Sequence, residues 1–103
     1  MTDKNAVEIV TFRLNEGVSR EDFLIAVAET QPVIDGFNGY IKRQLIESDS
    51  GQWIDLVWWA TLDDALTAAE AIMTEPRIAP FGSKIDPDSV TMLHGHPVTI
   101  QDS

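Results

Sequence analysis

The apolar positions of this chain follow the spacing of strands in some segments and the spacing of helices in others. Four segments rich in β-branched and aromatic residues are bounded by turn residues, which is typical of strands: residues 6–14, 40–48, 52–60 and 89–98. Two helical patterns lie between them, after Ser19 and after Thr61. The order strand-helix-strand-strand-helix-strand predicts an α+β, ferredoxin-like split βαβ fold. This fold has a four-stranded antiparallel sheet with two helices on one face.

The first helix is predicted to begin after Ser19, whose hydroxyl can cap the first turn. Pro32 lacks an amide hydrogen, so this helix should end just before it, near Thr30 or Gln31. The positions expected to face the core are Phe23, Ala26, Val27 and Thr30.

The second helix is predicted to begin after its cap, Thr61, and to stop before Pro76. The positions at helical spacing, expected to face the core, are Leu62, Ala65, Leu66, Ala69, Ile72 and Met73. Residues 76–85 are a connector with room for one short helical turn.

All three tryptophans lie in the third strand, within "QWIDLVWWAT". One face of this strand would carry Trp53, Asp55, Val57 and Trp59, and the other Ile54, Leu56, Trp58 and Ala60. Neither set is typical of a face in water, and monomers seldom expose a large apolar patch. Helices can cover one face, so we expect a second copy to cover the other, in a homodimer. The alternative is that some tryptophans lie at the sheet edge under the C-terminal segment.

The chain has 103 residues, which predicts a single domain over residues 1–103. Its net charge of −10 argues against binding nucleic acid or an anionic membrane, because both require a basic patch. With no cysteine, it has neither disulfides nor thiolate chemistry. We see no signal peptide and no apolar run long enough to span a membrane, so a cytoplasmic location is expected.

Three stretches resemble the dimeric α+β barrel superfamily, and especially its antibiotic biosynthesis monooxygenase-like branch: "EIVTFRLNEGVSREDF", "GFNGYIKRQLIESDSGQWIDLVWWATLDDA" and "TEPRIAPF". The resemblance implies a barrel of two sheets, with a pocket in each subunit between sheet and helices or inside the barrel. It also implies binding of an apolar or aromatic small molecule, with cofactor-independent monooxygenase chemistry as one form of the function. The alternative is a non-catalytic ligand-binding protein, sensor or stress-responsive structural dimer. No cofactor is expected.

Two other activities of the superfamily fit this sequence poorly. Haem-degrading relatives place a histidine on the second helix and an asparagine on the first strand, and this chain has neither there. Polyketide cyclases of the superfamily carry histidines in the connector before the last strand, where this chain reads "TEPRIAPFGSKI".

Asp55 is a candidate catalytic residue because a carboxylate is disfavoured in the middle of a strand and costly when buried alone. A buried carboxylate can serve as a general base or as a polar contact for a ligand. The structural alternative is an ion pair with Lys42, Arg43 or Arg13. A catalytic Asp55 should face a cavity without a fixed partner, whereas a structural one should be paired, with no enclosed pocket.

His94 is the second candidate catalytic residue, as a general base. It forms a His-x-His pair with His96, and such a pair supplies two metal ligands when the strand continues. A metal site would need a further ligand such as Glu8 or Asp55, and no metal is predicted. The structural alternative is a strand-end pair without chemistry.

Four residues are candidates for ligand binding. The three tryptophans, Trp53, Trp58 and Trp59, can line a pocket for a flat aromatic molecule, although tryptophans in a strand are more often core or interface residues. Arg43, on the neighbouring strand, is a candidate polar contact.

Overall fold

A four-stranded antiparallel sheet forms one layer of the computed structural model, which describes residues 5–99 and residue 101. Its strands are β1 (Ala6–Phe12), β2 (Tyr40–Glu47), β3 (Trp53–Trp59) and β4 (Thr91–Gly95). They lie in the order β2-β3-β1-β4, so the third strand pairs with the first as the split βαβ arrangement requires. The predicted α+β, ferredoxin-like fold is confirmed.

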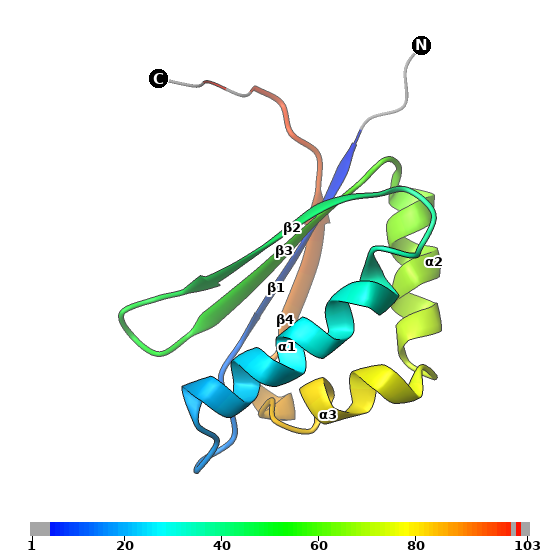
Figure 1. The fold of residues 1–103 in the computed structure, drawn as a ribbon. Helices are drawn as coiled ribbons and strands as arrows, with labels where there is room; N and C mark the ends of the chain where they lie inside the picture. Colours follow the sequence, from blue (N-terminus) through cyan, green and yellow to red (C-terminus); the bar gives the residue numbers. More distant parts are fainter. Residues whose placement is uncertain (1–4, 100, 102–103) are drawn as a thin grey trace.

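The helices form a second layer on one face of this sheet (Figure 1). The long helices are α1 (Arg20–Ile34) and α2 (Leu62–Ile72), and the connector forms a 3₁₀ turn, η1 (Pro76–Ile78), followed by α3 (Ala79–Gly82). A second 3₁₀ turn, η2 (Pro87–Ser89), precedes β4. None of the helices in residues 5–99 is long and apolar enough to cross a membrane.

Both predicted helix caps are confirmed. The Ser19 hydroxyl accepts a hydrogen bond from the amide of Asp22 at 3.1 Å, and the Thr61 hydroxyl accepts one from the amide of Asp64 at 3.0 Å. These bonds satisfy amides that have no partner within the first helical turn.

Helix α1 does not end before Pro32, as predicted, but continues to Ile34 with the proline inside it. Pro32 lies in the last turn, where it removes a single intrahelical hydrogen bond. The next two residues, Val33 and Ile34, are both buried, which favours continuation of the helix. The amide of Asp35 then bonds to the Gln31 carbonyl at 2.9 Å and closes the helix.

Two other details of the prediction are wrong. Leu66 and Met73 of the expected α2 stripe are exposed, and Ala68 is buried in their place. The last strand is shorter than residues 89–98, because Ser89 belongs to η2 and its pairing with β1 ends at Gly95. Pro97, which lacks an amide hydrogen, follows two residues later.

The two faces of β3 have different surroundings. Trp53, Asp55, Val57 and Trp59 are buried on the helix side. Trp59 packs in a cluster with Ile34 of α1 and with alanines of α2, while Trp53 packs with Phe12 and Phe23. The opposite face carries Ile54, Leu56 and Trp58, which are half-buried in the single chain.

Candidate functional site

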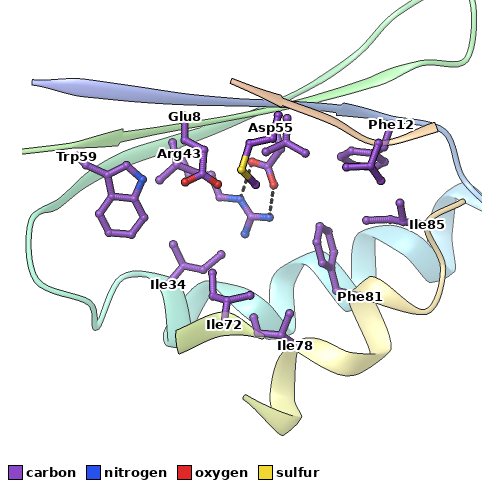
Figure 2. A pocket seen from close by; sticks show the side chains of 14 residues that line it. Glu8, Phe12, Ile34, Arg43, Asp55, Trp59, Ile72, Ile78, Phe81 and Ile85 are labelled. Carbon is purple, nitrogen blue, oxygen red and sulfur yellow. Dashed lines mark hydrogen bonds and ion pairs between the residues drawn. The ribbon is translucent and has the colours of Figure 1, made fainter. Parts of the chain in front are cut away.

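A cavity of about 170 Å³ lies between the sheet and the helices (Figure 2). Its walls are mainly apolar, from all four strands, from α1 and α2, and from the connector before β4. The apolar lining residues are Val10, Phe12, Ile34, Val57, Trp59, Ile72, Ile78, Phe81, Ile85, Val90 and Met92. Glu8, Arg43 and Asp55 are the charged residues in this lining. An apolar cavity with a few convergent polar groups is typical of a small-molecule site.

Arg43 and Asp55 form a buried, two-point ion pair across β2 and β3. The Arg43 Nε and Nη2 atoms lie 2.9 and 2.7 Å from the two carboxylate oxygens of Asp55. The remaining guanidinium nitrogen, Nη1, donates to the Thr30 hydroxyl of α1 at 2.8 Å. Such pairs fix orientation as well as charge. Of the partners predicted for Asp55, the structure selects Arg43. Asp55 therefore combines a fixed partner with a place in a cavity wall, which neither sequence-based alternative anticipated.

Glu8 lies in the middle of β1 with its carboxylate directed from the sheet toward the helices (Figure 2). His94 is its register partner on β4, and the His94 Nε2 atom lies 3.5 Å from the Glu8 Oε1 atom. Burial raises the pKa of the Glu8 carboxyl above its ordinary value of 4.5, and the nearby charge of Asp55 acts in the same direction. His94 and Arg43 oppose this rise. Glu8 is thus a cavity-facing carboxyl whose protonated form is favoured by its surroundings.

Trp59 adds a neutral hydrogen-bond donor to the cavity wall. Its side chain is 1% exposed, and its indole Nε1 donor has no hydrogen-bond partner among the described residues. Buried donors are rarely left without a partner. A ligand that carries an oxygen acceptor would satisfy it.

The structure brings together three of the six predicted site residues. Arg43, Asp55 and Trp59 line the cavity. Trp58 is on the opposite face of the sheet, where the Lys42 ammonium lies 4.4 Å from its ring centroid. Trp53 is outside the lining and packs against Phe23, with ring centroids 4.9 Å apart.

His94, the remaining predicted residue, is outside the lining too, beside Glu8. His96 follows the end of β4, and its Nδ1 atom lies 2.8 Å from the Asn5 carbonyl oxygen. Within the part of the chain that the structure describes, no group of three or more histidine, aspartate or glutamate side chains is placed to hold a metal ion.

Sequence reasoning missed Glu8 as a cavity residue in its own right. It treated Glu8 only as a neighbour of Asp55 and as a possible third metal ligand. The available signal was a carboxylate within a strand that is otherwise nearly all apolar, "AVEIVTF". The contribution of the connector, with Ile78 and Phe81, was missed as well.

Neither a protein-family model nor a curated protein matches the sequence, but solved structures match the fold. One is a candidate antibiotic biosynthesis monooxygenase from Bordetella bronchiseptica, with a TM-score of 0.80 at 18% identity, covering 94% of this chain and 100% of that one. The ActVA-Orf6 monooxygenase of Streptomyces coelicolor, solved with Nanaomycin D, has a TM-score of 0.72 at 17% identity, with coverage of 97% and 94%. SnoaB, a cofactor-independent oxygenase from Streptomyces nogalater, has a TM-score of 0.65 at 15% identity and covers 96% of each chain.

This chain therefore has the α+β fold of these solved structures, which are described as antibiotic biosynthesis monooxygenases or cofactor-independent oxygenases among others. The resemblance stated from the sequence is confirmed at the level of the fold. Because one fold hosts many activities, the function has to be argued from the cavity.

Proposed function

We propose that this protein binds a small aromatic molecule in the cavity under its sheet and oxidises it with dioxygen, without a cofactor. The observation that carries the proposal is the apolar cavity with a few convergent polar groups. The neighbours described as monooxygenases, one of them as a cofactor-independent oxygenase, support the chemistry.

The volume of the cavity limits the size of the ligand. An engineered protein cavity of about 150 Å³ holds benzene. The cavity here, at about 170 Å³, suits one aromatic ring or two fused rings. Trp59 and the apolar side chains of α1, α2 and α3 would enclose the rings.

The polar groups have distinct roles in this proposal. Trp59 would donate its indole N–H to an oxygen of the ligand, and Arg43 would stabilise negative charge that develops on the ligand. Asp55, predicted to be a base, is held on both oxygens by Arg43, which suits it better to orienting the guanidinium. The predicted base His94 would act through Glu8, which lies beside it in the cavity wall.

The oxidation balances without an added reductant when the substrate has an activated methylene group. The two C–H bonds break and a C=O bond forms, while the second oxygen atom leaves as water with both hydrogens. The substrate thereby supplies all the electrons. The protein's part is to position the substrate and to stabilise its anion.

Oxygen uptake tests this function. Protein purified with a chelator should consume dioxygen in the presence of a two-ring hydroxynaphthalenone that carries an activated methylene group, faster than the autoxidation of that compound. The product should contain one atom of isotopically labelled dioxygen. Trp59→Phe, which keeps the aromatic wall but removes the N–H donor, should lower the rate. Uptake equal to that of heat-unfolded protein with this substrate would reject the oxygenase proposal.

Non-catalytic ligand binding, as a carrier, sensor or stress-responsive dimer, is the second candidate function. The fixed pairing of Asp55 with Arg43 favours it, because a carboxylate bound on both oxygens is a poor base. It predicts saturable binding of hydroxynaphthalenes with no oxygen uptake.

We also propose a homodimer that covers the sheet face opposite the helices. That face carries half-buried apolar side chains on β1 and β3, among them Ile9, Leu56 and Trp58, and Leu93 of β4 is 56% exposed there. An apolar sheet face of this kind is typical of a protein interface. Face-to-face packing of two sheets would bury it.

A further inference from the structure

Glu8 and Asp55 are the two carboxylates in the cavity lining, and Glu8 is the better placed of the two to accept a proton. Both oxygens of Asp55 accept hydrogen bonds from Arg43, at 2.9 and 2.7 Å. For Glu8, in contrast, the His94 Nε2 atom approaches one carboxylate oxygen at 3.5 Å, at the outer limit of a hydrogen bond. In the close-up view the Glu8 carboxylate lies between Trp59 and Arg43, on the cavity side of the sheet (Figure 2).

His94 lies on the other side of Glu8 from Arg43, on the edge strand β4. Its side chain is 18% exposed, and that of Glu8 is 12% exposed. The His94 Nε2 atom is buried and has no hydrogen-bond partner among the described residues. Glu8 therefore lies between the cavity, which it lines, and the His94 side chain on the edge strand.

We propose that the ligand carries an acidic hydroxyl, as a phenol or an enol does, and that Glu8 accepts its proton while His94 passes the proton on to solvent at the edge of the sheet. This inference rests on the proposed function and assigns the residues of the same cavity that would move the proton. In the first step the ligand O–H bond breaks, its electron pair stays on the ligand oxygen, and the proton binds to Glu8. In the second step the proton moves from Glu8 to the Nε2 atom of the His94 tautomer that carries its proton on Nδ1, and the Nδ1 proton then leaves to water.

The charges around Glu8 suit this exchange. Arg43 of β2 faces the cavity as a cation and would stabilise the ligand anion. Asp55 of β3 raises the pKa of Glu8, and His94 of β4 lowers it. Burial raises the pKa of the Glu8 carboxyl, which is the direction that makes a carboxylate a stronger base.

The test compares two probes of nearly equal shape, 1-naphthol and 1-methoxynaphthalene. Both carry an oxygen that can accept from Trp59, but only 1-naphthol can donate to Glu8. We expect wild-type protein to prefer 1-naphthol by about tenfold once Glu8 is ionised, because a carboxylate is a strong acceptor. The preference should grow as the pH rises through the pKa of Glu8, which lies above 4.5. Tryptophan fluorescence titration or calorimetry measures the two dissociation constants.

Variants separate the roles of the two residues. Glu8→Gln should reduce the preference and remove its dependence on pH, whereas the control Glu70→Gln, on the exposed side of α2, should behave as wild type. His94→Asn removes a neighbour that lowers the pKa of Glu8, so the rise in preference should shift to higher pH.

Equal affinity for the two probes at every pH would overturn the role of Glu8 and leave the apolar cavity as a binding site. Binding of neither probe would overturn the proposed function, and the hydroxyl-selective site with it. A preference that persists unchanged in Glu8→Gln would assign the hydroxyl contact to another group and contradict the proposal.

Discussion

At the scale of single residues, the cavity contains two carboxylates in different environments. Asp55 is bound by a guanidinium, whereas Glu8 lies beside an imidazole at a longer distance. Environment sets the behaviour of a carboxyl group, because burial favours its neutral form and a close cation favours its charged form. The two residues should therefore respond differently to mutation.

Arg43→Met should destabilise the fold by about 3–5 kcal/mol, because it leaves a buried carboxylate without its partner. The side chains of Arg43 and Asp55 are only 5% and 10% exposed. The matched control is Arg20→Met, which removes an exposed pair with Glu47 and should change stability little. Urea unfolding measures both, and equal effects would show that the Arg43–Asp55 pair is not a buried, stabilising contact.

The dependence of stability on pH reports on Glu8. Its pKa is raised in the folded state, so the native protein holds a proton that the unfolded chain releases above 4.5. Its contribution to stability is present below that pH and is lost as the pH rises through the pKa of the folded state. The free energy of unfolding of wild type should thus fall relative to that of Glu8→Gln as the pH increases. Parallel curves for the two proteins would contradict the raised pKa.

The sequence identified Asp55 but not Glu8, and the reason is geometric. An aspartate next to tryptophans is conspicuous in any register, and the candidate cations were few. The surroundings of Glu8 depend on the pairing of β1 with β4, which places His94 opposite it across a gap of 85 intervening residues along the chain. A pattern within one strand carries no information about that partner.

At the scale of elements, the period of the apolar residues predicted the strands and helices, while tertiary burial set their ends. Pro32 shows where the periodic pattern fails to predict a helix end. The helix continues past it because the burial of Val33 and Ile34 outweighs the lost hydrogen bond. The α2 stripe shows another difference, because Ala65 packs in the cluster with Trp59 as predicted, but Ala68 is buried there while the larger Leu66 and Met73 are exposed. Size complementarity between α2 and a tryptophan is not visible in a periodic pattern.

Gly39 links α1 to β2 and limits the approach of α2. Its φ of +82° is in the left-handed region, and a Cβ added there would overlap the side chain of Asp64 down to its Cβ atom. Gly17 has a similar φ of +86° with open space around it. Gly17→Ala should therefore cost about 1 kcal/mol for the backbone alone. Gly39→Ala should cost clearly more, and thermal unfolding of both variants measures the difference. If Gly39→Ala and Gly17→Ala destabilise the protein equally, Asp64 of α2 moves away from residue 39 at no cost, and the predicted overlap is contradicted.

At the scale of the whole molecule, the helices cover one face of the sheet and leave the other face uncovered in the single chain (Figure 1). The Lys42 side chain lies over Trp58, but Leu93 stays largely exposed in the single chain. A domain of this size also gains from burying surface against a second copy.

Leu56→Lys should convert the proposed dimer into a monomer, because it places a charge in the middle of the apolar face. The control is Leu66→Lys on α2, at a leucine that is already 48% exposed, which should remain dimeric. Light scattering after size-exclusion chromatography gives the mass of each. A wild-type monomer at micromolar concentration would refute the dimer, as would a dimeric Leu56→Lys variant.

The strict alternation of β3 has a consequence for how such a protein can evolve. Trp58 and Trp59 are adjacent in the chain, yet one belongs to the outer face and the other to the cavity wall. Point substitutions can thus change ligand choice at one position and leave assembly at the next untouched. Inserting or deleting a single codon within this strand would exchange the two faces and damage both properties at once. Variation among natural relatives should therefore consist of replacements inside the strand, with changes of length confined to the turns on either side.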